Sequence, residues 1–328
     1  MINLKKILLV ESQRELLLFL LLNKKYEDLY FIFFDNFDKE IIKNFSKNSK
    51  VIQYFYPKKN GILKIIEKIF YLKEKRKAKE DLKGEFYGYD HSLMGAIYNE
   101  EKLILLEDGM LDYKILNGKK KIKLNFKEFI KKIVYNQRTP NDYNSFKITK
   151  IYLSDFFQYN LPKNLLKKTQ IINFKKLWFE KSIEEKKYIL QVFNITELSF
   201  RIINNKETIL FTQPLSEDKC ISEEEKISIY REILKKYKEK EVVIKPHPRE
   251  KTNYKEHFPK YCILEEKVPI ELLILNGLEI KKAVTLFSTA VFGLGKDTEI
   301  DFYGTEVHPN ILKRFGSMDR IMKRNKFL

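Results

Sequence analysis

Cysteine is almost absent from this chain of 328 residues, which contains two cysteines and no Cys-X-X-Cys pair. The chain therefore lacks the disulfide framework of a small secreted domain and the clustered Cys and His ligands of a zinc site. Cys220 and Cys262 fit a reducing compartment, so we expect a cytoplasmic protein. We also expect no metal ion and no obligatory cofactor.

Glycine and proline are scarce as well, with 11 and 9 residues, while hydrophobic residues make up 44%. This composition excludes a long low-complexity or disordered arm and suits two globular domains of about 150 residues each. The apolar runs are short. Residues 7–10 and 16–22 fall well below the ~20 residues that a membrane-spanning helix needs, and no cleavage site of a signal peptide follows them. We expect neither a membrane-spanning helix nor a secretory signal.

Acidic residues are fewer than basic ones. The chain contains 45 Asp and Glu and 63 Lys and Arg, which gives a net charge of +18. Such an excess often marks a protein that binds nucleic acid or an anionic membrane. Here the lysines are spread over the whole chain, without zinc-finger spacing or an aromatic RNA-binding signature. We therefore expect no nucleic-acid partner. The basic segments 58–83 and 114–150 leave open a noncatalytic protein that binds nucleic acid or a membrane.

Lysines alternate with apolar residues in the segment 119–127. Their aliphatic stems could lie around an apolar face that rests on the inner membrane, so peripheral membrane contact is one hypothesis. A solvated helix face is the alternative.

Short apolar runs rich in β-branched and aromatic residues alternate with helical patterns along the chain. Strands are predicted at 7–10, 30–34, 51–55, 103–106, 151–153, 208–211, 242–244, 261–264 and 283–287. A helix is predicted within 62–82, and Ser222 with Glu225 forms a capping box before another. This order predicts an α/β protein of two Rossmann-like, doubly wound domains that face a cleft. We place the domains at residues 1–180 and 181–328, with the boundary in the charged stretch 180–187.

A histidine follows the most apolar strand of the second half. The run Val242–Ile244 is β-branched, and His247 comes shortly after it between two prolines that restrict the backbone. Ligands of open α/β sheets bind beyond the carboxyl ends of the strands. Because Lys245 and Arg249 flank the histidine, the pattern favours a proton donor beside a phosphate. A histidine that only packs in the loop is the alternative.

An acidic turn follows a strand of the first half, where Leu103–Leu106 leads into Glu107, Asp108 and Gly109. A carboxylate there could accept the proton of a hydroxyl group while a histidine protonates a departing phosphate oxygen. An ordinary surface turn or a set of metal ligands is the alternative.

Two further motifs suit a nucleotide. The strand within 283–287 ends at Ser288 and Thr289, whose hydroxyls and backbone amides could bind a phosphate at the start of a helix. Glu271, just inside another predicted helix, could hold ribose hydroxyls. Helix capping by the Ser-Thr pair is the alternative.

In their order, these motifs resemble those of bacterial sialyltransferases: an acidic-acidic-Gly turn, a His-Pro pair and a downstream Ser-Thr pair. The spacing and the phrases at 86–91 and 212–218 look most like glycosyltransferase family 52, the lipooligosaccharide sialyltransferases. The resemblance covers about residues 85 to 310, and it implies the GT-B fold.

The resemblance implies that His247 is the general acid toward the phosphate of CMP. It also implies that five residues bind the donor: Lys245 and Arg249 at the phosphate charge, Ser288 and Thr289 at the phosphate oxygens, and Glu271 at the ribose. Two general bases stay open. Asp108 matches the acidic turn, and Asp218 lies in the Gln-Pro-Leu segment of this family. The segment Glu11–Arg14 departs from the small polar, Pro-containing loop expected after the first strand.

The activity implied is an inverting, metal-independent transfer of N-acetylneuraminic acid from CMP-Neu5Ac to a terminal galactose hydroxyl. The acceptor would be a surface glycan such as lipooligosaccharide, with an α-2,3 linkage. The N-terminal domain would take the acceptor side and the C-terminal domain the nucleotide sugar. A glycosyltransferase of the same family with another nucleotide-sugar donor, for example a glucosyltransferase, is the alternative. A homodimer stays open.

Overall fold

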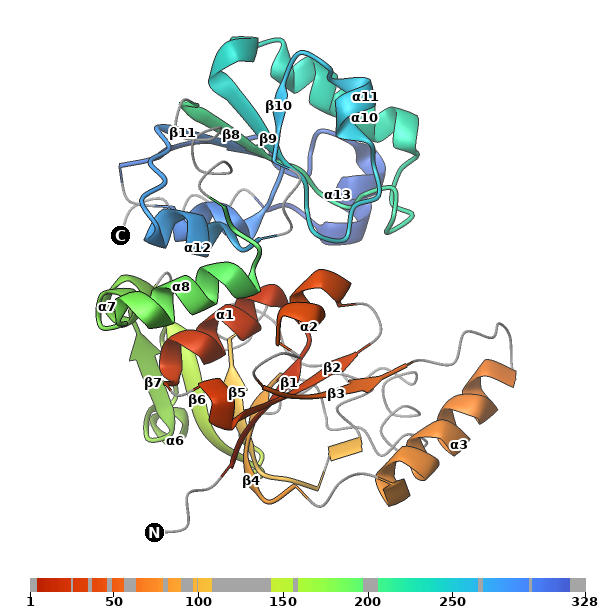
Figure 1. The fold of residues 1–328 in the computed structure, drawn as a ribbon. Coiled ribbons are helices and arrows are strands. Elements are labelled where there is room, and N and C mark those ends of the chain that lie inside the picture. The colour runs from red at the N-terminus through yellow and green to blue at the C-terminus, as the bar shows by residue number, and fades with distance from the viewer. Residues whose placement is uncertain are drawn as a thin grey trace. The chain divides into compact units, whose positions relative to one another are not determined.

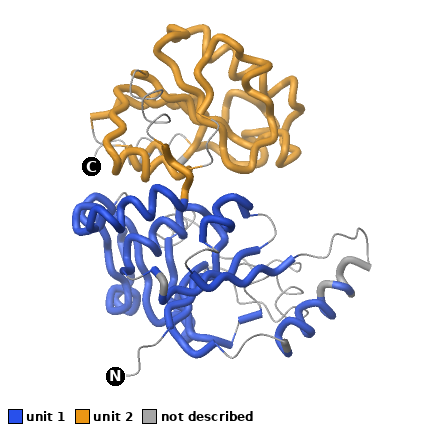
Figure 2. Tube along the Cα trace, viewed as in Figure 1, with its two compact units in different colours: residues 1–192 blue, residues 193–328 orange. Residues whose placement is uncertain are grey.

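The computed structural model, drawn in Figure 1, describes residues 5–24, 26–34, 37–45, 49–55, 63–78, 82–89, 97–98, 100–107, 143–155, 159–196, 206–264, 268–294 and 297–318. It divides into two compact units, Met1–Val192 and Phe193–Leu328 (Figure 2). Each unit contains its own sheet of parallel strands with helices packed on it. The α/β class with two Rossmann-like, doubly wound domains is therefore confirmed.

Unit 1 is built on a seven-stranded parallel sheet with the order β3-β2-β1-β4-β5-β6-β7. Its strands are β1 (Lys5–Val10), β2 (Leu29–Phe34), β3 (Lys50–Tyr54), β4 (Gly84–Gly88), β5 (Leu103–Leu106), β6 (Ile148–Ser154) and β7 (Thr169–Ile172). Its helices are α1 (Gln13–Leu22), α2 (Lys39–Phe45), α3 (Leu63–Ala78), α6 (Lys163–Leu166), α7 (Phe174–Phe179) and α8 (Ile183–Val192), with the 3₁₀ turn η1 (Tyr26–Asp28).

The central strand β1 is buried on both faces, as its continuous apolar sequence predicts for a strand of a parallel sheet. Ile7 and Leu9 point to one face, where they share a cluster with Leu72 of α3. On the other face Leu8 pairs with Phe31 of β2, and that ring meets Phe19 of α1 edge-on with 5.7 Å between centroids. Helices therefore cover both sides of the sheet.

Unit 1 includes helix α8, whose first half overlaps the stretch 180–187 in which the sequence analysis placed the domain boundary. The ring of Tyr188 on α8 stacks on that of Tyr26, with 4.5 Å between centroids. The side-chain amide of Asn44 on α2 donates to the last two carbonyls of α8 at 3.1 and 3.2 Å. The charged stretch thus marks the start of α8, whereas these packing contacts attach the helix to unit 1.

Unit 2 is built on a five-stranded parallel sheet with the order β10-β9-β8-β11-β12. Its strands are β8 (Thr208–Phe211), β9 (Val242–Lys245), β10 (Cys262–Ile263), β11 (Lys282–Thr285) and β12 (Glu299–Phe302). Its helices are α10 (Glu223–Leu234), α11 (Tyr254–His257), α12 (Ile270–Leu275) and α13 (Pro309–Phe315), with the 3₁₀ turns η3 (Glu239–Glu241) and η4 (Thr289–Gly293).

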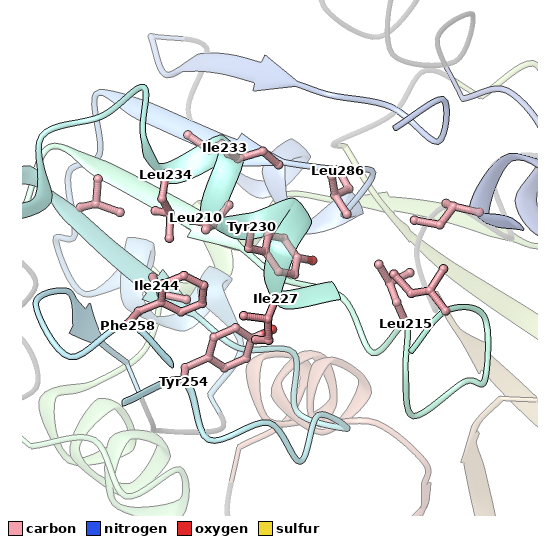
Figure 3. Packing of buried hydrophobic residues seen from close by; sticks show 14 of the residues in the cluster. Leu210, Leu215, Ile227, Tyr230, Ile233, Leu234, Ile244, Tyr254, Phe258 and Leu286 are labelled. Atoms are coloured by element: carbon pink, nitrogen blue, oxygen red, sulfur yellow. The ribbon is translucent and has the colours of Figure 1, made fainter. Parts of the chain in front are cut away.

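Helix α10 supplies much of the core of unit 2 (Figure 3). It begins at the predicted capping box, in which Ser222 and Glu225 each bond the other's backbone. Ile227, Tyr230 and Leu234 follow at helical spacing and are buried in the cluster that also contains strand residues. The helix ends at Leu234, and the next three residues form a turn.

The sequence analysis did not predict three strands, β4, β7 and β12, because none of them is a continuous apolar run. In β4 the reason is a close backbone approach, since a Cβ on Gly84 would lie 2.1 Å from the carbonyl oxygen of Lys5. The glycine that weakens the strand pattern is the residue that lets β4 pair with β1.

Candidate active site at the carboxyl edge of the second sheet

The site begins with three neighbouring strands of unit 2. Strands β9, β8 and β11 lie side by side and parallel, so the loops that follow them leave the sheet at one edge. These loops are 246–253, 212–222 and 286–288. The strand order reverses between β8 and β11, and ligands of doubly wound sheets bind at such switch points. The predicted His-Pro, Gln-Pro-Leu and Ser-Thr motifs therefore lie at one functional edge.

His247 follows β9 by two residues and is partly buried. Burial and, to a smaller extent, the positive charges of Arg249 and Lys245 together lower the pKa of its ring to about 4. The backbone N–H of Arg249 donates to Nδ1 of the ring at 3.2 Å. Because Nδ1 accepts this bond, the neutral ring carries its proton on Nε2.

Lys245 is the last residue of β9 and is 5% exposed, so its charge lies inside the unit next to the histidine. Arg249 is far more exposed and forms a two-pronged ion pair with Asp218, whose N–O distances are 2.8 and 3.2 Å. Arg314 of α13 also donates to the backbone carbonyl of Asp218. The structure thus brings the predicted acid, both predicted phosphate cations and one predicted base into one group.

A buried ionic cluster lies behind this group and was not predicted. The ammonium group of Lys226 on α10 is fully buried. It lies 3.0 Å from carboxylate oxygens of Glu217 and Glu223 and 3.7 Å from one of Glu250. A buried cation is stable only when such partners replace its water. The cluster joins α10 to the loops that follow β8 and β9.

Glu217 is the member of this cluster next to Asp218. Burial raises the pKa of its carboxyl group, but hydrogen bonds from the backbone N–H of Lys251 and from Lys226 outweigh that and lower it to about 2. The bond from Lys251 is 2.6 Å long. Glu217 is therefore ionised at neutral pH and ties the loop after β8 to the loop after β9.

The Ser-Thr motif follows β11 as predicted, but the helix there is the 3₁₀ turn η4 rather than an α-helix. Ser288 caps it, because its hydroxyl accepts the N–H of Ala290 at 3.3 Å. The side chain of Thr289 lies outside the described residues. Glu271 sits in the first turn of α12 and is 7% exposed, and a Cβ on Gly293 of η4 would lie 3.4 Å from its Cγ. Glu271 therefore packs against the turn that Ser288 begins.

In unit 1 the acidic turn follows β5, and Asp108 lies outside the described residues. Its neighbour Glu107 is fully buried. Arg14 donates to one oxygen of this carboxylate at 2.8 Å, Tyr159 donates to the other at 3.2 Å, and Ser154 donates through both N–H and hydroxyl. The first acid of the turn is thus an internal anchor rather than a group that faces solvent.

The segment after β1 differs from the expected Pro-containing loop for a reason that the structure shows. Ser12 and Glu15 form a capping box that begins α1 immediately after the strand. Arg14 then lies on the first turn of α1, where it reaches Glu107. Through Arg14, this charged segment therefore anchors Glu107, the first residue of the acidic turn.

The sequence analysis missed two sets of contacts, that of Arg14 with Glu107 and that of Lys226 with its carboxylates. In both, buried side chains join different elements. Arg14 and Glu107 are 93 positions apart, and Lys226 and Glu217 are 9 apart but on different elements. One local signal was available, because Lys226 lies on the apolar side of α10 between Ser222 and Tyr230. A lysine at such a position indicates a buried ion pair.

Among the described residues, no group of three or more His, Cys, Asp and Glu side chains could hold a metal ion. In the same part of the chain, no helix combines the length and the apolar character required to cross a membrane.

Several known proteins are similar to this chain in sequence or in fold. A protein of Haemophilus influenzae described as uncharacterized is 34% identical over 320 residues, which are 96% of this chain and 99% of the relative. A 2,6-sialyltransferase of a Vibrionaceae Photobacterium species, solved with the donor product CMP and the acceptor substrate lactose, is similar in structure with a TM-score of 0.65. It is 12% identical, over 98% of this chain and 76% of that one.

The GT-B domain of a sialyltransferase from Photobacterium damselae matches with a TM-score of 0.55 and 14% identity, over 90% of this chain and 89% of that one. At these identities the likeness shows the fold, which is GT-B. The sequence itself matches the family model of glycosyltransferase family 52 over residues 26–311. This match spans most of both units, and the chain therefore belongs to glycosyltransferase family 52.

Proposed function

We propose that this glycosyltransferase transfers N-acetylneuraminic acid from CMP-Neu5Ac to a terminal galactose hydroxyl, with inversion and without an obligatory metal ion. The observation that carries the proposal is the neutral ring of His247 between the charges of Lys245 and Arg249 at the carboxyl edge of unit 2. Two cations beside a proton donor suit the phosphate of a nucleotide sugar. The relatives of similar fold support the sialyl donor, since one was solved with CMP and lactose.

In the proposed reaction, the acceptor hydroxyl oxygen bonds to the anomeric carbon of the sugar as the bond from that carbon to the phosphate oxygen breaks. His247 gives its Nε2 proton to the departing phosphate oxygen, and a carboxylate accepts the hydroxyl proton. Burial, together with the charges of Arg249 and Lys245, holds the pKa of His247 near 4, and a bound phosphate would offset the contribution of these charges. Donor binding would therefore raise this pKa toward the range of a general acid.

The general base is either Asp108 or Asp218. Asp218 is paired with Arg249, so it becomes a base only if the donor phosphate draws that cation away. Asp108 follows the anchored Glu107 directly, and that anchor fixes where the turn begins. We propose that Ser288 and Thr289 bind phosphate oxygens and that Glu271 binds the ribose, which assigns unit 2 to the donor and unit 1 to the acceptor.

The decisive experiment is calorimetry of the full chain with CMP, UMP and GMP, followed by transfer assays with CMP-Neu5Ac and lactose. We expect CMP to bind at least about tenfold more tightly than the other nucleotides, which corresponds to about 1.4 kcal/mol. Tighter binding of UMP or GMP, with transfer from the matching nucleotide sugar, would contradict the sialyl donor and indicate another donor, such as a nucleotide-linked glucose. Binding of DNA that weakens steeply with salt, without nucleotide preference, would support the noncatalytic alternative.

The acceptor is proposed to be a surface glycan such as lipooligosaccharide, joined in an α-2,3 linkage, and analysis of the product linkage tests this.

Peripheral contact with the inner membrane is proposed for the segment 119–127, which lies outside the described residues. Sedimentation with anionic liposomes at low salt tests that contact, and a protein that stays in the supernatant contradicts it. A homodimer is tested by light scattering.

A further inference from the structure

The backbone around His247 has few N–H groups that can donate hydrogen bonds. Because residues 246 and 248 are both prolines, the N–H of His247 is the one backbone donor of this three-residue segment. That N–H donates to Oε2 of Glu250 at 2.6 Å. In return the backbone N–H of Glu250 donates to the carbonyl oxygen of His247 at 2.9 Å. Glu250 therefore satisfies both backbone polar groups of the histidine.

The carboxylate of Glu250 is itself held firmly. Its side chain is 1% exposed. The hydroxyl of Thr212 donates to Oε2, the hydroxyl of Tyr254 donates to Oε1 at 2.6 Å, and Lys226 lies 3.7 Å from Oε1. These donors come from the loop after β8, from α11 and from α10. A buried carboxylate with this many donors cannot move without leaving them unpaired.

The direction of the imidazole ring depends on the same turn. The backbone N–H of Arg249 donates to Nδ1 at 3.2 Å, so Nε2 is the ring nitrogen that carries the proton. This bond forms only while residues 247–250 keep their turn, and Glu250 closes that turn from both ends. The position of the acid proton thus rests on Glu250.

We propose that Glu250 is a positioning residue of this enzyme, which holds His247 so that Nε2 can protonate the departing phosphate. The inference rests on the proposed role of His247 as general acid. Loss of the carboxylate would free the His247 N–H, let the turn open and move the ring away from the phosphate. Misplacement of a catalytic group by about 1 Å can cost about 10²-fold in rate, so the loss falls on kcat rather than on donor KM.

The test is a double-mutant cycle on the full chain with His247→Ala, measured as transfer from CMP-Neu5Ac. Glu250→Asp keeps the charge beside Lys226 but shortens the reach to the His247 N–H, and we expect kcat to fall about tenfold or more. Glu250→Gln keeps an oxygen acceptor for that N–H and should lose less than Glu250→Asp. In the His247→Ala background, Glu250→Asp should cause no further loss, because the group that it positions is gone.

Glu223→Ala is the matched control, because Glu223 contacts Lys226 in the same cluster and accepts a hydrogen bond from Ser216 rather than from the His247 backbone. We expect this variant to lower the melting temperature and to leave kcat within about threefold of the wild type. An equal loss from Glu250→Asp in the wild-type and His247→Ala backgrounds would overturn the positioning role while the acid assignment survives. Near-normal transfer by His247→Ala alone would remove the acid assignment, and the positioning role with it.

Discussion

Each unit carries a buried glutamate at the carboxyl end of its strands, and the two glutamates have different surroundings. In unit 1, Glu107 faces a single cation, Arg14, at 2.8 Å. In unit 2, Glu250 is one of three carboxylates around the buried ammonium group of Lys226. The first cluster balances its charges, whereas the second holds more negative than positive charge.

The charges next to each cluster differ as well. In unit 2 two cations flank the partly buried His247: Lys245 at the end of β9 and Arg249 in the loop that follows. In unit 1 the anchor joins α1, β5 and β6 through neutral donors and one arginine. A buried acid at a strand end is therefore not by itself the mark of a binding site. The cations gathered beside a titratable ring distinguish the edge of unit 2 at which we propose that the donor binds.

The largest effect is expected from His247→Ala, which tests whether the chemistry belongs to unit 2. Loss of the proton donor should lower transfer by about 10² to 10⁴-fold, while the melting temperature stays close to that of the wild type. A donor with a better leaving group should recover much of this loss, because its departure needs less protonation. A melting temperature that falls while transfer persists would make the histidine a packing residue.

The next effect decides which unit supplies the general base. Asp108→Asn and Asp218→Asn should differ sharply in turnover, with a loss of about 10²-fold or more for the true base and little change in CMP affinity. Calorimetry with CMP separates turnover from binding. Asp218→Asn also releases Arg249 from its ion pair, so a change in CMP affinity there would assign Asp218 to donor binding. Two small and equal effects would exclude both residues.

The clusters themselves can be compared by removal of their cations. Breaking a buried ion pair costs about 3–5 kcal/mol, and we expect Lys226→Met to reach that range because it leaves three carboxylates without their cation. Arg14→Met should cost less, since one carboxylate remains and it keeps donors from Ser154 and Tyr159. Unfolding in urea measures both.

The control for this comparison is Lys235→Met, because Lys235 pairs with Glu232 on the surface, where ion pairs contribute about 1 kcal/mol or less. A loss of stability in Arg14→Met that equals or exceeds that of Lys226→Met would contradict the difference between the two units.

The smallest effect is a pH dependence at His247, whose pKa of about 4 lies below that of an unfolded histidine. As the pH falls from about 6.5 through 4, the unfolded chain binds the proton first, so wild-type stability should decline relative to His247→Asn in this window. Above it the difference should be constant. Ring NMR of the folded protein should show the pKa rising when CMP is added, and an unchanged pKa would contradict phosphate binding beside the ring.

The fold could be read from the sequence wherever burial on both faces required an unbroken apolar run. Strands β1, β2, β5, β8 and β9 meet that condition and were predicted. Strand β12 alternates charged and apolar residues, because one of its faces meets solvent, and it was missed. The charged stretch 180–187 suggested a domain boundary, and compact unit 1 extends to Val192 because α8 is attached to it by aromatic stacking.

The sequence located the His-Pro loop, the Gln-Pro-Leu loop and the Ser-Thr pair because each directly follows an apolar strand, and a strand end is a local property. It could not identify Glu250 as the residue that holds His247, although only two positions separate them. The reason is that Glu250 carries the same charge as many surface glutamates, and only its burial by Thr212, Tyr254 and Lys226 makes it rigid.

The amino-acid sequence by itself determined the alternating α/β order, the family resemblance and the strand ends at which the candidate site residues lie. These depend on periodicity and on short motifs, which are properties of neighbouring residues. The tertiary structure decided which charges meet: Arg249 with Asp218, Lys226 with its carboxylates, and Arg14 with Glu107. Electrostatic energies depend on distance and on exclusion of water, and both are set only when segments far apart in the chain pack together.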